Sequence, residues 1–172
     1  MILQDAISAF LSGDRENFFR EFSEPIIIQF RNRRRFSSSS SGTSLSDQKN
    51  KKNLPQVVQL LKQGSSFPLI PLQVPRGGVA LVRVGRSEQN DIVIQDDTVS
   101  ARHAVFIVHK ATGTVSLKDL ASSNGTWVNE QRLVTATETV LFDGDTLFFG
   151  EIGFLFFYPR GLFEVISSLV NR

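Results

Sequence analysis

The chain has 172 residues, of which 41% are hydrophobic and 21% are charged. That length allows one domain with a proper core, or one domain and a small appendage, and the composition is that of a soluble globular protein. The chain has no cysteine, which excludes disulfides and thiolate chemistry and fits a reducing compartment. The longest apolar runs, 25–30 and 154–158, are too short to span a bilayer, and the N-terminus lacks the basic leader of a signal peptide. We therefore expect a cytoplasmic protein without a membrane partner.

The net charge of +2 is unevenly distributed along the chain. Residues 31–52 carry four Arg and three Lys against one Asp, whereas residues 76–160 carry eight basic and ten acidic side chains. Together with the serines at 37–41, this composition predicts a disordered, basic and Ser-rich linker over residues 31–53. A basic run can bind nucleic acid through phosphates. Without interleaved aromatic residues or a base-reading element, a solvated linker is favoured over nucleic-acid binding.

Residues 1–30 are predicted to form a helical segment. Apolar residues recur at helical spacing up to Gly13, and Asp14 suits the N-cap of a second short helix that Pro25 would end. Helices this short need a surface to dock on: the rest of the chain, a second copy or a partner. Packing on the chain itself is favoured, oligomerisation or partner binding stays open, and the acidic polar face argues against a membrane anchor.

Two further helices are predicted outside the central part of the chain. Residues 54–66 read as a short helix and connection, with Pro55 in the first turn and Gly64 beyond the end. Residues 160–172 place apolar side chains at helical spacing, which predicts a C-terminal helix that packs back on the body.

From Phe67 onward, short β-branched runs alternate with turn residues. Leu69–Val74 and Val79–Val84, joined by a Pro-Arg-Gly-Gly turn, predict an opening hairpin, and two prolines mark its first strand as an edge strand or an irregular one. The spacing of the later runs is typical of a two-sheet β-sandwich. These runs are residues 91–95, 104–108, 114–118, 132–134, 137–142, 146–149 and 153–157.

Three polar fragments lie at the turns between these strands. They are Gly85-Arg86, Ser100-Ala101-Arg102-His103 and Ser123-Asn124-Gly125-Thr126. Loops on a rigid scaffold commonly carry binding residues. Two arginines, two serines and an asparagine supply many hydrogen-bond donors and two fixed positive charges, which suit a dianionic cluster of oxygens.

In these fragments the chain resembles the forkhead-associated (FHA) domain, a phosphothreonine-reading β-sandwich. Gly-Arg, Ser-x-x-His and Asn-Gly follow one another in the family's order, and Asp143-Gly144-Asp145 matches its closing turn. The resemblance covers residues 67–159. It implies a mainly β fold, an FHA-like two-sheet sandwich with short N-terminal helices and a C-terminal helix.

The resemblance also implies roles for individual residues. Arg86 would be the main phosphate clamp, and Ser100 would donate its hydroxyl to a second phosphate oxygen. Arg102 would add charge at the phosphate or read a downstream side chain; both roles stay open. Ser123 and Asn124 would border the peptide, with the Asn124 amide gripping its backbone.

Three residues are expected to support the binding loops. By the resemblance, His103 ties the loop by hydrogen bonds, Gly85 forms the tight turn before Arg86, and Gly125 permits the turn after Asn124. Ser100 and His103 lack the third group of a catalytic triad. Two histidines without cysteine cannot form the usual metal cages. We therefore expect a non-enzyme without metal or cofactor.

The leading hypothesis is a phosphothreonine-dependent adaptor or scaffold in signal transduction, downstream of a Ser/Thr kinase. Its partner would be a phosphothreonine-containing protein or peptide, and the kinase itself is a candidate partner. The alternative is a structural protein that assembles through its N-terminal helices, with the FHA-like domain as scaffold. Thr43, in the linker, offers another route to self-association if it is phosphorylated and enters the pocket of its own chain or a neighbour.

Overall fold

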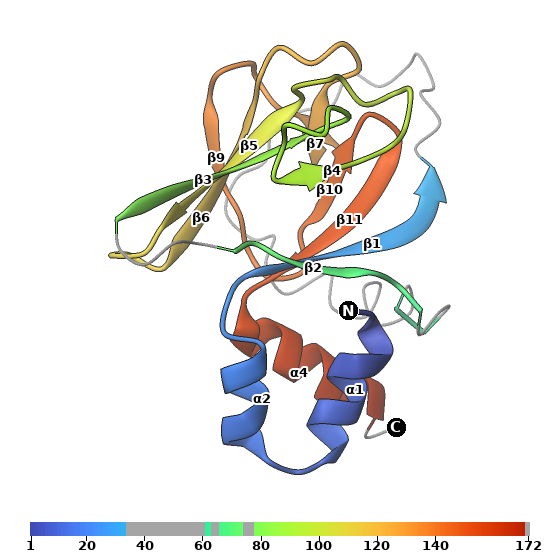
Figure 1. The fold of residues 1–172 in the computed structure, drawn as a ribbon, viewed down its shortest axis with the longest axis vertical. Coiled ribbons are helices and arrows are strands. Elements are labelled where there is room, and N and C mark those ends of the chain that lie inside the picture. The colour runs from blue at the N-terminus through green and yellow to red at the C-terminus, as the bar shows by residue number, and fades with distance from the viewer. Residues whose placement is uncertain (34–60, 63–65, 74–77, 171–172) are drawn as a thin grey trace.

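The computed structural model describes residues 1–33, 61–62, 66–73 and 78–170. Two β-sheets pack face to face, and helices lie beneath one of them (Figure 1). The fold is therefore the mainly β, two-sheet sandwich with N-terminal helices and a C-terminal helix that the sequence predicts. Its elements are α1 (Leu3–Leu11), α2 (Arg15–Glu21), β1 (Ile26–Arg33), β2 (Leu69–Pro71), β3 (Val79–Gly85), β4 (Ile92–Val93), β5 (Ala104–His109), β6 (Thr114–Asp119), β7 (Thr126–Val128), β8 (Gln131–Arg132), β9 (Glu138–Val140), β10 (Thr146–Phe149), β11 (Ile152–Phe157) and α4 (Pro159–Val170).

The six-stranded sheet has the order β2-β1-β11-β10-β7-β8, and the five-stranded sheet has the order β4-β3-β5-β6-β9. Side chains alternate across β3, so that Ala80, Val82 and Val84 are buried while Val79, Leu81 and Arg83 are exposed. The buried faces of the two sheets meet in a core with Phe149 at its centre. The Phe149 ring lies 5.6 Å from that of Phe154 and 6.0 Å from that of Phe106.

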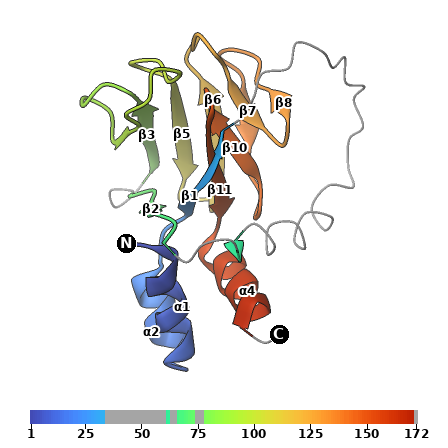
Figure 2. The ribbon, with the colours of Figure 1, turned by 90° about the vertical axis from the view of Figure 1, so that its right-hand side faces the viewer.

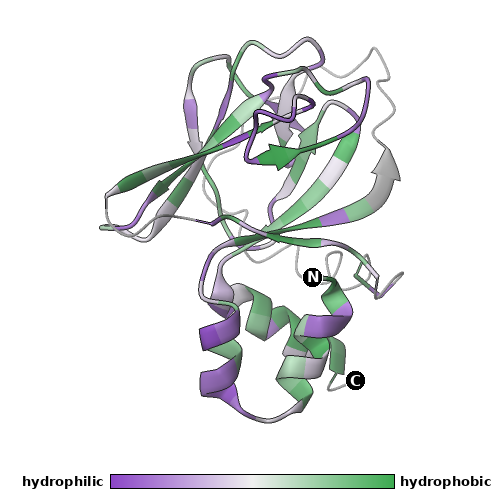
Figure 3. Ribbon diagram, in the orientation of Figure 1, coloured by the Kyte–Doolittle hydropathy of each residue, from purple (hydrophilic) through white to green (hydrophobic). Residues whose placement is uncertain are grey.

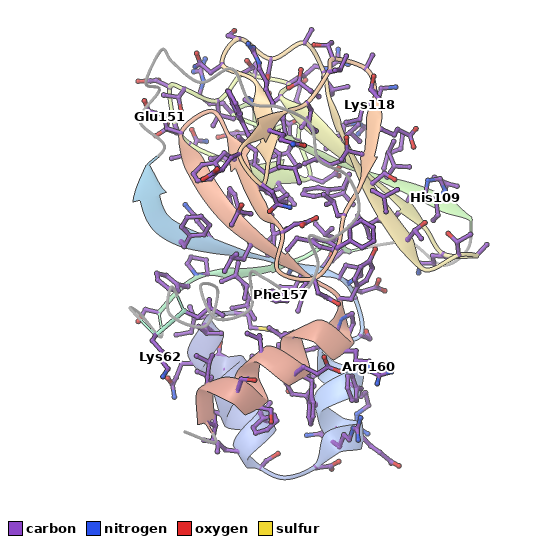
Figure 4. All side chains as sticks on the ribbon, turned by 180° about the vertical axis from the view of Figure 1, so that it is seen from behind. Lys62, His109, Lys118, Glu151, Phe157 and Arg160 are labelled. Atoms are coloured by element: carbon purple, nitrogen blue, oxygen red, sulfur yellow. The ribbon has the colours of Figure 1, made fainter. Side chains whose placement is uncertain are left out.

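A second apolar core fills the space between the six-stranded sheet and the helices. Figure 4 shows Phe157 at this junction, above α4. Ile26, Ile28, Leu155 and Phe157 point into it, opposite the face that covers the first core. Residues Ile26–Ile28 of β1 and Phe154–Phe157 of β11 are therefore buried on both faces, which explains why these two runs are apolar without alternation.

The first thirty residues are not helical throughout, which corrects the prediction for residues 1–30. Ile26–Arg33 forms strand β1, antiparallel to β11 through Ile26↔Phe157 and to β2 through Ile26↔Pro71. The linker prediction also fails for residues 31–33, which belong to this strand. The sandwich is thus built partly from residues far before position 67.

The predicted opening hairpin is also wrong. Strand β2 pairs with β1 in the six-stranded sheet, whereas β3 pairs with β5 in the other sheet. Because β1 occupies the position beside β2, the chain crosses between sheets after residue 71 instead of turning back. Residues 34–60, including Thr43 and most of the predicted 54–66 helix, lie outside the described residues; Leu61 of that segment is helical and buried.

The N-terminal helices pack against the C-terminal helix and the sheet. Asp14 caps α2 as predicted, its side chain accepting a hydrogen bond from the Asn17 N–H at 2.9 Å. Phe163 of α4 lies 5.2 Å from the Phe18 ring and 4.9 Å from the Phe10 ring. Figure 3 shows α4 largely in the hydrophobic colour, α1 in both colours, and the outer side of α2 in the hydrophilic colour. Of the three docking surfaces considered, the structure uses the chain's own sandwich and C-terminal helix.

No helix among the described residues is long and apolar enough to cross a membrane.

Candidate functional site

Three loops meet at the end of the sandwich that lies away from the helices (Figures 1 and 2). They follow β3, precede β5 and join β6 to β7, and they carry the three polar fragments found in the sequence. The hydrogen bonds between them decide which side chains face a common ligand.

Arg86 begins the first of these loops and is exposed. Its backbone N–H donates to the Ser100 carbonyl at 3.0 Å, and its Nε donates to the Val99 carbonyl at 3.2 Å. This leaves the two terminal amino groups of the guanidinium without a protein acceptor in the described part of the chain. The hydrogen bond from Nε thus orients the Arg86 side chain, while its two terminal amino groups remain available to a ligand.

Gly85 allows the first two loops to approach closely. A Cβ at this position would lie 2.4 Å from the Ala101 carbonyl oxygen and 2.8 Å from Asn90 Nδ2. The Asn90 amide donates to the Ser87 and Ala101 carbonyls at 2.7 Å each. Glycine is therefore required here by space, and Asn90 links the two loops in a way the motif alone did not indicate.

The second and third loops are joined by side-chain hydrogen bonds. Ser100 Oγ accepts from the Ser123 N–H at 3.0 Å and lies 3.4 Å from Ser123 Oγ. Asn124 Nδ2 donates to the Thr98 carbonyl at 2.8 Å. These contacts bring Ser100, Ser123 and Asn124 together beside the loop that anchors Arg86. Arg102 is exposed next to Ser100 and makes no hydrogen bond or ion pair in the described part of the chain.

His103 is buried beneath these loops and connects two of them. Its Nδ1 accepts from the Ser100 N–H at 3.0 Å, and its Nε2 lies 3.2 Å from the Gly125 carbonyl, to which it donates. Burial lowers the pKa of His103, although the Gly125 carbonyl and Asp119 oppose that shift. Because Nδ1 is occupied by a backbone N–H, the imidazole cannot act as the base for the Ser100 hydroxyl.

Asp119, which the sequence did not single out, organises the third loop from below. Its carboxylate accepts from Ser122 Oγ at 2.5 Å, from Thr126 Oγ1 at 2.6 Å and from the Ser122 N–H at 3.1 Å. Burial alone would raise the pKa of Asp119, but these hydrogen bonds, with the nearby His103, outweigh it and lower the pKa. Ser122 is thus turned inward, away from the exposed rim that Arg86, Ser100, Ser123 and Asn124 form where the three loops meet.

Two further residues lie at the site without a signal in the sequence. Thr98 supplies the carbonyl that holds Asn124, and its hydroxyl donates to Asp96 at 2.5 Å. Arg132 lies against Gly125, where an added Cβ would come within 2.5 Å of the guanidinium Nε. Gly125 has φ +82, a backbone conformation that favours glycine. Neither Thr98 nor Arg132 belongs to a motif; only the pairing of distant segments places them here.

The rim therefore presents donors from three loops, and it lacks the geometry of a nucleophile with its base. Within the described residues no group of three or more His, Cys, Asp or Glu side chains gathers to hold a metal ion. What this arrangement can do chemically is bind a compact, multiply charged anion through a guanidinium and a hydroxyl.

The fold and the rim thus define a β-sandwich binding domain whose loops suit an anionic ligand. Residues 82–150 match the family model of the FHA domain, and this part of the chain is an FHA domain.

Two mycobacterial proteins are similar to the chain over this region. The chain is 39% identical over 99 residues to the transcriptional regulatory protein EmbR of Mycobacterium tuberculosis, covering 58% of this chain and 23% of EmbR. It is 37% identical over 84 residues to the ABC transporter ATP-binding/permease protein Rv1747 of the same species, covering 49% and 9% of the two chains. The solved structure of M. tuberculosis EmbR in complex with a low-affinity phosphopeptide aligns with a TM-score of 0.44 at 34% identity, over 52% of this chain and 21% of that one. The chain thus spans less than a quarter of the length of these relatives.

Proposed function

We propose that this chain is a phosphothreonine-dependent protein-binding module. The observation that carries the proposal is the junction of three loops at one rim, where Arg86 is anchored to Val99, Ser100 to Ser123 and Asn124 to Thr98. In the proposed complex Arg86 and Ser100 hold the phosphate, and Asn124 grips the peptide backbone. The match of residues 82–150 to the FHA domain supports this assignment.

The donors suit a phosphothreonine in charge and number. The phosphate carries about −1.5 to −2 charges and three acceptor oxygens at neutral pH. The terminal amino groups of Arg86 offer two or more N–H donors to it, and the Ser100 hydroxyl offers another. Arg102, one residue before His103, adds a second positive charge at the same loop.

The Asn124 side chain suits an extended peptide backbone. One N–H of its amide holds the Thr98 carbonyl, which leaves a second N–H and the carbonyl oxygen for a peptide that offers both donor and acceptor groups. Because few strong contacts act on a short peptide, we expect a dissociation constant in the micromolar range, roughly −8 kcal/mol.

The proposed biological role is that of an adaptor or scaffold that recognises the product of a Ser/Thr kinase. The helical end of the molecule gives no separate support to assembly as the main function, because the apolar faces of α1 and α2 are largely covered within the chain.

A degenerate peptide library with one fixed phosphothreonine tests the proposal. Enriched peptides are synthesised with and without the phosphate and titrated against the chain by fluorescence anisotropy. We expect binding of the phosphorylated form only, with loss of that binding in Arg86→Gln and Ser100→Ala. Equal binding of both forms would remove the proposal. Arg160→Gln, an exposed arginine in α4 at the opposite end of the molecule (Figure 4), serves as the matched charge control.

A further inference from the structure

Arg132 is a positively charged residue beside the rim to which the proposed phosphate site assigns no role. Its residue is exposed, and within the described chain no carboxylate lies within ion-pair distance of it and no hydrogen bond engages its guanidinium. A fixed positive charge beside a ligand-binding loop, with no ion-pair or hydrogen-bond partner among the residues that the structure describes, is available to the ligand.

Two pairings fix the backbone that carries this side chain. Strand β8 pairs with β7 so that Arg132 lies opposite Trp127, and the next residue, Leu133, donates its N–H to the Thr126 carbonyl at 2.9 Å. Directly paired residues of antiparallel strands point to the same face. Because Thr126 and Val128 are buried and Trp127 is only half buried, that face is the outer one.

The guanidinium of Arg132 lies against Gly125 in the third loop. A Cβ at Gly125 would lie 2.5 Å from Arg132 Nε and 3.1 Å from both Cζ and Nη2. The planar group thus occupies the space that a side chain at position 125 would take, one residue along the loop from Asn124. The indole N–H of Trp127 donates to the Asn124 carbonyl at 3.3 Å, which ties the same surface to the peptide-gripping residue.

We infer that Arg132, flanked by Trp127, is a specificity-determining residue that recognises a carboxylate side chain of the bound phosphopeptide. The inference rests on the proposed function and names its substrate class: phosphothreonine peptides with an aspartate or glutamate at a flanking position on the Asn124 side. The guanidinium offers a planar fork of donors to the carboxylate.

The flanking position is within reach of a short peptide. An extended chain advances about 3.3 Å per residue, so roughly four residues cover about 13 Å from the phosphothreonine. The test therefore takes the best phosphothreonine peptide, replaces its flanking residues by alanine, and places a single Asp or Glu at each of roughly four positions on either side. Dissociation constants are measured by anisotropy for the unaltered chain, Arg132→Gln, Arg132→Lys and Arg160→Gln.

We expect an acidic residue at one position, or at two neighbouring ones, to tighten binding to the unaltered chain about two- to fivefold, the range of an exposed ion pair. Arg132→Gln abolishes this gain, Arg132→Lys retains part of it, and Arg160→Gln keeps all of it. The gain shrinks when salt is raised from about 0.05 to about 0.3 M. The alanine-flanked phosphopeptide binds Arg132→Gln as tightly as it binds the unaltered chain.

The inference is overturned if no acidic position depends on Arg132, or if Arg132→Gln weakens the alanine-flanked peptide as much as the acidic ones. The second outcome would make Arg132 a phosphate contact or a support of the loop, and it would leave the proposed function intact. If phosphorylated and unphosphorylated peptides bind equally to the unaltered chain, the proposed function fails and this inference fails with it.

Discussion

The two ends of the molecule are built in opposite ways. At the loop end, side-chain hydrogen bonds between polar residues hold three turns in place, and the interacting positions all fall within residues 86–125. At the helical end, phenylalanine rings from α1, α2 and α4 pack together, joining residues near opposite ends of the sequence. If the loop end is the proposed recognition site, recognition and stability are carried by different parts of the chain.

Single substitutions that alter only the loop end or only the helical end can test this separation of recognition from stability. The proposed site at the loop end uses exposed donors that lie outside the cores, whereas the helical end is held together by buried rings. We therefore expect substitutions at the two ends to separate the free energy of unfolding from the free energy of binding.

The largest effect is expected for Phe18→Ala. The Phe18 ring is fully buried and contacts the rings of Phe22 and Phe163 at 4.8 and 5.2 Å between centroids. Removing a buried phenylalanine costs about 3–5 kcal/mol of unfolding free energy, which urea denaturation measures. Binding of the phosphopeptide by the folded fraction should not change. A loss below about 1 kcal/mol would mean that the helical layer is separable from the sandwich.

Arg86→Gln should give the reverse result. We expect phosphopeptide binding to weaken by about 2 kcal/mol or more, roughly 30-fold, because the phosphate loses its charged donor. The unfolding free energy should change by less than about 0.5 kcal/mol, since the side chain is exposed and, among the residues that the structure describes, makes one hydrogen bond, to Val99. Anisotropy and urea denaturation on the same preparation separate the two quantities. Comparable losses in both would contradict the separation, and Arg160→Gln should alter neither.

The sequence predicted the positions of the three loops and of the terminal helices far better than strand β1, and the reason is physical. Strands β5 and β6 are bounded by turn residues, so the fragments around Ser100 and Asn124 fall at loops whichever strands pair. Strand β1 gave no such signal, because Ile26, Ile27 and Ile28 are buried on both faces and show no alternation. Its partner β11 lies more than a hundred residues away, so local patterns could not reveal the pairing.

The same limit applied within the site. Residues that follow one another in motifs, such as Gly85 and Arg86, were identified from the sequence. Thr98 and Arg132 were not, since their roles depend on contacts with Asn124 and Gly125 across loops. Asp119 was not identified either, because its role as an acceptor for Ser122 and Thr126 depends on the folded third loop.

A smaller effect is expected at Gly161, where the sandwich contacts α4. Alanine normally stabilises a helix interior relative to glycine by about 1 kcal/mol. Here a Cβ would lie 2.1 Å from Asp143 Oδ1, the atom that accepts the Tyr158 N–H at the start of the helix. We expect this clash to prevail, so that Gly161→Ala lowers the unfolding free energy by about 1–3 kcal/mol. The double variant Gly161→Ala with Asp143→Ala should recover part of the loss; a more stable single variant would show that Asp143 moves aside freely.

The most gradual effect concerns pH and originates at His103. Its pKa is lowered in the folded protein, mainly because of burial, so the unfolded chain binds a proton that the folded chain does not. Stability is therefore complete above the ordinary histidine pKa of about 6.5 and falls as the pH drops toward the lowered value, by at most about 1.4 kcal/mol per pH unit. The lowered pKa of Asp119 acts in a different pH window, because its contribution to stability is lost only below about pH 3.8.

Urea denaturation between about pH 7.5 and 5 should thus show a dependence of the unfolding free energy on pH that His103→Asn removes, although that variant is less stable throughout. If this dependence survives in His103→Asn, the buried imidazole is not the group that titrates. The description of His103 as a neutral imidazole hydrogen-bonded to Ser100 and Gly125 would then be wrong.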